Sequence, residues 1–293
     1  MKQHHVPRSY LQGWVVEGKV VRVRRVGPQA GLEVRRCAPK GILWEKDLYT
    51  LPPGCTANGR KGTELEAELG AGSDARIRSL AEKVLRNGSG WVDEELARAV
   101  LSLMRTLSAR TPESLARVEE GVRFVQDEIA PALNAVVARE RAHADEACRK
   151  LAQYLDPRYP AGAARAALAE VHSVPGSPVA DWLDGEVRLV TRADVEAALS
   201  RLGLSGFPTF DRPVVDWEQN STGLLATLAI GPDMLVAAFP RGQSTARAPF
   251  DPDAVAGRHA IEPLRFRHTA VLNRKPASGS IWERVAAESL LPR

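Results

Sequence analysis

The sequence contains few aromatic residues and little cysteine. Aromatic side chains make up 5% of the 293 residues, which leaves few candidates for a surface on which nucleic-acid bases could stack. The three cysteines, Cys37, Cys55 and Cys148, are far apart and form no C-x-x-C pair. We therefore expect reduced thiols rather than a disulfide framework or a thiolate zinc site.

Long apolar runs are also missing. No stretch approaches the roughly 18 apolar residues of a membrane span, and the first residues are not followed by the apolar segment of a signal peptide. These absences predict a cytoplasmic protein with no membrane partner. Hydrophobic residues at 44% and charged residues at 26% are typical of a globular protein, which excludes disorder and collagen-like repeats.

The common catalytic motifs are absent as well. The chain has no G-x-S-x-G, H-E-x-x-H or Walker A sequence, and no G-x-G-x-x-G between a strand and a helix. The enzyme classes that depend on these motifs are therefore not expected. Any chemistry has to come from a less familiar set of residues.

Positive charge is concentrated in the first 60 residues. They hold 11 Lys and Arg against 4 Asp and Glu, a balance of +7, whereas the other 233 residues sum to −3. Arginine, the better bidentate donor to phosphate, accounts for 32 of the 40 basic residues. This distribution predicts either a phosphate-binding surface or a solvated strand face.

A β-hairpin is predicted near the amino terminus. Apolar and basic residues alternate over residues 19–26 and again over 32–36, with a Gly-Pro break between them. The two-residue period of a strand places Val21 and Val23 on a covered face and the intervening arginines on the other.

Helical patterns dominate from about residue 63 to 200, and apolar runs follow. The predicted helices cover residues 75–85, 96–107, 115–136 with an extension to 154, 163–171 and 192–199. The later segments are predicted as buried strands over 213–215, 224–230 and 234–240, a polar loop over 241–257, and helices over 258–273 and 281–290.

These patterns predict one α+β domain in which the two β parts share a sheet. It comprises an amino-terminal hairpin module (residues 1–62), a helical middle (63–200) and carboxy-terminal strands and helices (201–293).

The first candidate site lies in residues 3–14, which contain His4, His5, Arg8 and Tyr10. Imidazole acts as a base, an acid or a metal ligand near neutral pH, and the arginine and the tyrosine could bind or polarise an anion. Adjacent residues of an extended chain point to opposite faces, so the two histidines are not expected to chelate one metal. The alternative is a structural segment anchored by its aromatic residues.

Two further clusters carry charge at positions that suit a site. Asp211 and Arg212 lie directly before a predicted strand, where side chains project from a sheet into a cleft. A structural Asx turn is the alternative for Asp211. Arg105 and Arg110, five residues apart on one predicted helix, could hold a phosphate or pair with neighbouring glutamates.

These segments, in this order, resemble the DUF4238 family of uncharacterised and mainly bacterial proteins. The family opens with a pattern like Q-H-x-V-P-x-x-Y-L-x-x-F, matched here by residues 3–14, with Trp14 in the usual Phe position. An E-x-D-x-Y-like segment is similar to residues 45–49, and a helical R-T-P to residues 110–112. A late S-D-x-P-V is similar to residues 210–214, where Phe replaces the usual Ser.

The resemblance groups His4, Tyr10, Arg110 and Asp211, and it supplies no activity. It also implies a glutamate on a helix in the middle of the chain, for which Asp74 is the nearest substitute.

The residue types predict a hydrolase of nuclease type that acts on phosphodiesters. His4 or His5 is expected to be the general base or acid, and Arg8 and Arg110 to clamp the phosphate. Asp211 is expected either to orient a histidine or to bind a divalent metal. The remaining candidates are Tyr10 for catalysis and Arg22, Arg24, Arg105 and Arg212 for phosphate or nucleic-acid binding.

Two other functions stay open at this point. In one, the histidine segment is structural and the basic hairpin holds RNA, DNA or an acidic partner protein without catalysis. In the other, the chain is an enzyme that modifies a small molecule or a peptide. The sequence leaves the oligomeric state and the cofactor, including a divalent metal, undecided.

Overall fold

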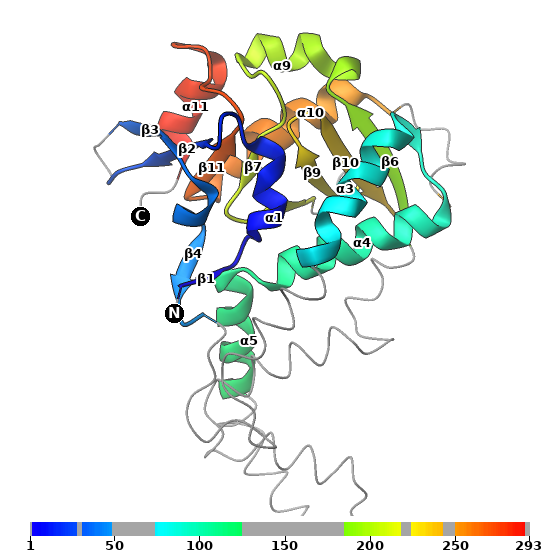
Figure 1. Cartoon of the computed structure of the whole chain (residues 1–293), viewed down its shortest axis with the longest axis horizontal. Coiled ribbons are helices and arrows are strands. Elements are labelled where there is room, and N and C mark those ends of the chain that lie inside the picture. The colour runs from blue at the N-terminus through cyan, green and yellow to red at the C-terminus, as the bar shows by residue number, and fades with distance from the viewer. Residues whose placement is uncertain are drawn as a thin grey trace, which may run out of the picture.

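Strands occur near both ends of the chain, and a run of helices separates them (Figure 1). The computed structural model describes residues 2–27, 31–48, 74–124, 185–217, 224–242 and 250–290. Its strands are β1 (Lys2–His4), β2 (Val20–Arg25), β3 (Leu32–Cys37), β4 (Trp44–Lys46), β5 (Gly90–Trp91), β6 (Glu186–Thr191), β7 (Thr209–Phe210), β8 (Val214–Asp216), β9 (Ala226–Gly231), β10 (Met234–Phe239) and β11 (Thr269–Leu272).

The helices complete the order of elements. The α-helices are α1 (Arg8–Leu11), α3 (Ala75–Asn87), α4 (Glu94–Ala109), α5 (Pro112–Phe124), α9 (Glu196–Leu202), α10 (Pro252–Ile261) and α11 (Ile281–Ser289). Short 3-10 helices are η1 (Gln12–Trp14), η2 (Pro39–Gly41), η7 (Ala193–Val195) and η8 (Glu262–Arg265).

A four-stranded antiparallel sheet joins the two ends of the chain. Its strand order is β3-β2-β11-β7, and β11 pairs with β2 from Thr269 opposite Arg24 to Leu272 opposite Val21. The amino-terminal hairpin and the carboxy-terminal part therefore share one sheet, but through β7 and β11, which were not predicted as strands; the predicted strands over 213–240 lie in another sheet. The predicted α+β class is confirmed.

The hairpin itself follows the alternation in the sequence. β2 and β3 pair along their whole length. Val21 and Val23 are buried, whereas Arg22 and Arg24 lie partly exposed on the other face. The two-residue period of the strand produces this division.

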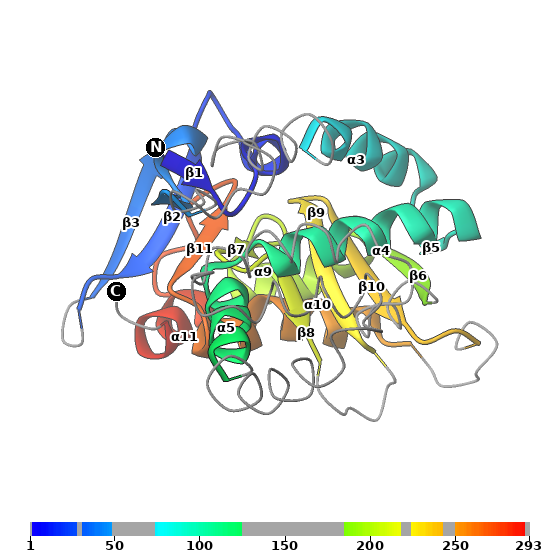
Figure 2. The ribbon, with the colours of Figure 1, turned by 90° about the horizontal axis from the view of Figure 1, so that it is seen from below.

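A five-stranded antiparallel sheet forms the centre of the molecule, in the order β5-β6-β10-β9-β8. Every residue of β9 and β10 is buried, which requires cover on both faces of the sheet. α4 contacts β6 and β8, and α10 is joined to β9 by a hydrogen bond of 2.8 Å between His259 Nδ1 and Thr227 Oγ1. Figure 2 shows the sheet between these two helices. The strands predicted over 213–240 are thereby confirmed.

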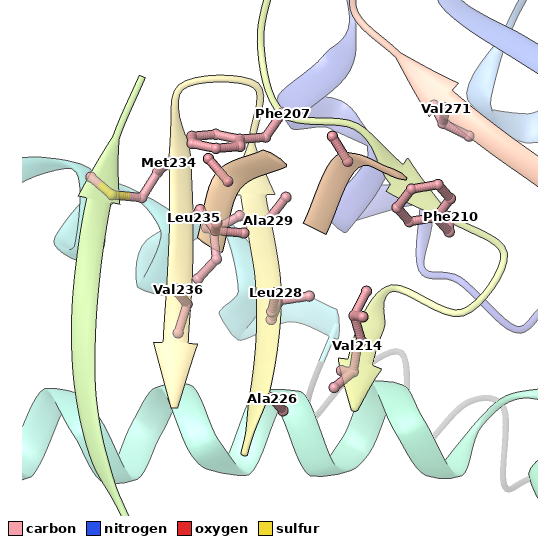
Figure 3. Packing of buried hydrophobic residues seen from close by; sticks show 14 of the residues in the cluster. Phe207, Phe210, Val214, Ala226, Leu228, Ala229, Met234, Leu235, Val236 and Val271 are labelled. Carbon is pink, nitrogen blue, oxygen red and sulfur yellow. The ribbon is translucent and has the colours of Figure 1, made fainter. Parts of the chain in front are cut away.

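The two sheets share one apolar core (Figure 3). Leu228 and Leu235, from the central sheet, belong to the same cluster of buried side chains as Phe210 and Val271 of the four-stranded sheet. Burial of a side chain of this size contributes about 1.5–3 kcal/mol. This shared apolar packing therefore fixes the position of the central sheet relative to the four-stranded sheet.

Capping residues set the bounds of α4. The Asp93 carboxylate accepts a hydrogen bond of 2.8 Å from the Leu96 backbone N–H, which satisfies a donor that the helix leaves unpaired. The helix ends at Ala109, and Pro112 begins α5 because a proline lacks the N–H that an inner turn would need. The apolar residues Val100, Leu103, Met104 and Leu107 of the helix predicted over 96–107 are buried.

Two predicted helices extend beyond the described residues. α5 is described to Phe124, so the predicted continuation to residue 136 or 154 lies outside them, as does the predicted helix over 163–171. Among the helices that are described, none has both the length and the apolar content to span a bilayer.

The predicted helix over residues 258–273 is wrong. α10 begins earlier, inside the predicted loop, and β11 occupies the end of the range. Pro263 cannot donate a helical hydrogen bond. Thr269 and Val271 are β-branched and pair with β2. Tertiary pairing therefore decides the conformation of a segment whose local pattern was ambiguous.

Two local signals were missed at the same time. The Asp251 carboxylate accepts a hydrogen bond of 3.1 Å from the Ala254 N–H and caps α10, with Pro252 at the first helical position. Residues Glu186–Thr191 form β6, an inner strand of the central sheet that the sequence analysis did not predict.

Candidate active site

A small cavity brings together side chains from distant parts of the chain. Its volume is about 170 Å³. Its lining is His5 after β1, Glu45 on β4, Pro112 and Glu113 at the start of α5, Asp211 after β7, and His268 before β11. The pairing of β1 with β4 and of β7 with β11 brings these strand ends together. Histidines and carboxylates are the residue types that general acid–base catalysis uses.

Asp211 is a buried carboxyl group in the wall of this cavity. It is 6% exposed, and its Oδ2 accepts a hydrogen bond of 3.1 Å from the His268 backbone N–H. Within the part of the chain that the structure describes, Oδ1 has no hydrogen-bond partner. Burial raises the pKa of Asp211, against the lowering effects of that N–H and of the Arg267 charge. Asp211 is therefore suited to hold a proton and to act as a general acid.

Glu113 lines the same cavity, but its pKa is shifted in the opposite direction. It lies in the first turn of α5, and its Oε2 is 3.0 Å from Nε of Arg212. Burial acts to raise the pKa of Glu113, but the hydrogen bond and charge of Arg212 and the charge of His5 lower it overall. Two carboxyl groups whose pKa values are displaced in opposite directions have the electrostatics of an acid–base pair.

The adjacent histidines of the amino terminus face different surroundings. His5 is 1% exposed and lines the cavity. His4 ends β1 and does not line it; burial lowers the pKa of His4 against a hydrogen bond to the Lys40 backbone. Successive side chains of an extended segment point to opposite faces. The structure therefore brings His5, and not His4, together with Asp211.

Arg110 joins helix ends beside His4. Its buried guanidinium forms an ion pair with Asp74 and donates a hydrogen bond of 3.2 Å to the His4 carbonyl. Asp74, the nearest substitute for the glutamate that the resemblance implied, is therefore bound to a buried arginine. Arg110 does not line the cavity, and neither do Arg8, exposed at the start of α1, and Arg105, buried on α4.

Tyr10 lies in the core. Its hydroxyl donates a hydrogen bond of 2.5 Å to the Ala229 carbonyl and shares one of 3.0 Å with Thr209 Oγ1. Its ring centroid is 5.1 Å from that of Trp14, and burial raises the pKa of Tyr10. These contacts hold α1 against β7 and β9, and Tyr10 does not line the cavity.

The two hairpin arginines are held by one acid. Arg22 lies 3.0 Å from Glu33 on the neighbouring strand β3, and Arg24 also pairs with Glu33. Neither arginine lines the cavity. Arg212, which was also predicted to bind phosphate, pairs with Glu113, which lines the cavity.

A larger groove adjoins the cavity. Its volume is about 540 Å³, and it lies between the start of α5, β8, α10 and η8. Its cationic lining residues are Arg117, Arg212, Arg258 and Arg267. Glu113 lines both the groove and the cavity. An arginine-lined surface therefore leads to the acid–base side chains.

Glu113, His268, Glu45 and Arg267 were not predicted as site residues. Glu113 directly follows the R-T-P segment, and Glu45 opens the E-x-D-x-Y-like segment, so the motifs contained a signal for both. His268 and Arg267 lay inside the wrongly predicted helix, where their position before a strand could not be seen.

A metal site is not formed by the described residues. Among them, no group of three or more His, Cys, Asp or Glu side chains is placed to hold a metal ion. The role of Asp211 as a ligand of a divalent metal therefore stays a prediction. The contacts of Asp211 described above are those that an acid–base role needs.

Comparison with known proteins finds a match to a protein-family model. The model of a family described as "Protein of unknown function (DUF4238)" matches residues 2–162. This span includes His5, Glu45 and Glu113, whereas Asp211 and His268 follow it. No curated protein and no solved structure matches the chain.

Proposed function

The chain belongs to the DUF4238 family, and we propose that it hydrolyses phosphodiester bonds by general acid–base catalysis at His5, Glu113, Asp211 and His268. The family has no known function from which an activity could be transferred. The observation that supports the proposal is the convergence of these four side chains on one cavity, next to an arginine-lined groove.

His5, Glu113 and Asp211 each have a defined role in the proposed reaction, and His268 positions Asp211 through its backbone N–H. His5, oriented by the ionised Glu113, takes a proton from a water molecule, whose oxygen attacks the phosphorus atom. Asp211 gives its proton to the leaving oxygen as the P–O bond breaks. Arg212 and Arg267 stabilise the negative charge that develops on the phosphoryl oxygens. The sum is the addition of one water molecule across one phosphodiester bond.

The two adjacent histidines provide a matched test. Purified protein is assayed with single-stranded and double-stranded DNA, RNA and bis-p-nitrophenyl phosphate, each with EDTA and with added Mg²⁺ or Mn²⁺. His5→Asn is expected to lower kcat by about 100-fold or more, the usual contribution of a general base. His4→Asn, outside the cavity, is expected to retain the wild-type rate.

Two results would contradict the proposal. One is the absence of hydrolysis of every substrate by the folded wild-type protein. The other is equal activity of His5→Asn and wild type, with both variants melting near the wild-type temperature. A strict requirement for Mg²⁺ or Mn²⁺ would instead support Asp211 as a metal ligand.

A non-catalytic binding module is the second candidate. Arg35 and Arg36 are exposed on the edge strand β3, where they could contact RNA, DNA or an acidic protein. In that case His5→Asn destabilises the fold by about 1 kcal/mol or more, as loss of a buried polar group does, and leaves nucleic-acid binding unchanged. Action on a small molecule or peptide, and a cytoplasmic location, stay predictions.

A further inference from the structure

We infer that the groove beside the cavity binds single-stranded nucleic acid, with one base stacked on Phe266. The inference rests on the proposed function, because it names the class of phosphodiester that would reach Glu113. Phe266 follows η8, lines the groove and is 64% exposed. A large apolar ring at the wall of an arginine-lined groove is a surface on which a planar ligand can stack.

Arg267 supplies a built anion position next to that ring. The residue is 7% exposed, and its Nη2 donates a hydrogen bond of 3.2 Å to the Val214 carbonyl. Among the described residues, its Nε has no hydrogen-bond partner. A buried charged donor that lacks an acceptor is unfavourable, and a phosphate oxygen in the groove would supply the acceptor.

Other cations of the groove are held in fixed positions. Arg258 lies 2.7 Å from Glu262 and 4.8 Å from the ring centroid of Trp217, and Arg212 is held by Glu113. Asp216 also lines the groove, so acids and arginines are interspersed there. This pattern suits a strand whose phosphates alternate with apolar bases better than it suits a uniformly charged ligand.

The stacked position requires an unpaired strand. In a duplex, both faces of each base are covered by its neighbours, whereas in a single strand a base can turn out and lie on an aromatic side chain. Single-stranded nucleic acid is therefore the substrate class that uses both Arg267 and Phe266.

The test measures binding with a probe that resists hydrolysis. A fluorescent oligothymidylate with phosphorothioate linkages is compared with an abasic oligomer of the same length and charge, by anisotropy. Phe266→Ala is expected to raise the Kd for oligothymidylate between about 5-fold and 150-fold, the effect of losing one stacked base. The Kd for the abasic oligomer is expected to stay at the wild-type value. Ile281→Ala, which removes an exposed apolar side chain outside the groove, is the matched control.

Three results would overturn the inference: an unchanged Kd in Phe266→Ala, an equal loss for both oligomers, or a duplex that binds as tightly as the single strand. Phe266→Leu keeps apolar volume without an aromatic face, and it replaces Phe266→Ala if the latter does not fold. Base-dependent binding without any hydrolysis overturns the proposed function and keeps this groove assignment. Hydrolysis by the wild-type protein, together with an unchanged Kd in Phe266→Ala, keeps the proposed function and overturns the groove assignment.

Discussion

Asp211 and Glu113 carry the same functional group and line the same cavity, yet their pKa values are displaced in opposite directions. Burial dominates at Asp211, while the guanidinium of Arg212 prevails at Glu113. Because the proposed reaction uses protonated Asp211, kcat/KM is expected to fall as pH rises through the pKa of Asp211.

Arg267 provides a test of that assignment. Its charge lowers the pKa of Asp211, so Arg267→Gln is expected to move the alkaline limb of the kcat/KM profile to higher pH. The limb is measured between pH 4 and 9 with bis-p-nitrophenyl phosphate, and Arg98→Gln on the exposed face of α4 is the control. A shift of the limb to lower pH would show that Asp211 is not the acid.

His259 is a buried titratable group with a structural role. Its Nδ1 is 2.8 Å from Thr227 Oγ1 and its Nε2 is 3.2 Å from the Pro208 carbonyl. Burial lowers the pKa of His259 to about 4. The unfolded chain therefore takes up a proton as pH falls from about 6.5 to 4, while the folded protein does not. The stability of the fold is complete above that window and decreases through it.

The predicted loss of unfolding free energy across the window is about 3 kcal/mol. Urea unfolding at several pH values between 4 and 7 measures it. His259→Asn is expected to be less stable than wild type at pH 7 and to depend less on pH. Parallel curves for the two proteins would show that His259 does not cause the acid sensitivity.

At the scale of elements, Arg110 connects the start of α3, the end of α4 and the end of β1. Its side chain is 5% exposed, whereas that of its partner Asp74 is 21% exposed. Removing the arginine leaves a half-buried carboxylate and a backbone carbonyl without that donor. Arg110→Met is therefore expected to lower the unfolding free energy by about 3 kcal/mol, the usual cost of breaking a buried ion pair from one side.

Arg98 is the control for this effect. It pairs with Glu94 at 3.1 Å on the exposed face of α4, where such a pair contributes at most about 0.5 kcal/mol. Arg98→Met is therefore expected to unfold near the wild-type urea concentration. If Arg110→Met also unfolds near the wild-type urea concentration, the ion pair with Asp74 does not stabilise the packing of α3, α4 and β1.

Local patterns predicted the elements whose conformation depends on their own residues. The alternation around Val21 predicted the β2–β3 hairpin, and the apolar spacing before Pro112 predicted α4 and its end. β11 could not be predicted in this way. Its four residues become a strand because β2 and β7 offer partners on both sides, and sequence periodicity contains no information about a partner far along the chain.

The candidate site was predictable to the same extent. His5 stood out by residue type, and Asp211 by residue type and by its place before a predicted strand. Glu113 was indicated through its place directly after the R-T-P segment, and His268 lay inside the wrongly predicted helix. The role of both depends on which strand ends and helix starts meet, which sequence patterns do not show. The sequence also could not show that Arg110 forms an ion pair with Asp74, because the packing of α3 against α4 brings those two residues together.

At the scale of the whole molecule, two basic surfaces are candidates for the proposed binding of nucleic acid. Arg117 lines the groove on α5, and Arg35 is exposed on the hairpin. If the groove binds the strand, Arg117→Ala is expected to lower the slope of log Kd against log salt concentration by about 1, the loss of one phosphate contact. Arg35→Ala is expected to leave the slope unchanged. The opposite result would favour the hairpin and the non-catalytic module.

The pairing of β11 with β2 has a consequence for synthesis. A ribosome makes His5 and the hairpin well before Asp211 and His268. One wall of the cavity is therefore absent until the growing chain has passed His268. Under the proposed function, this delay would keep the nascent chain inert beside the messenger RNA that encodes it.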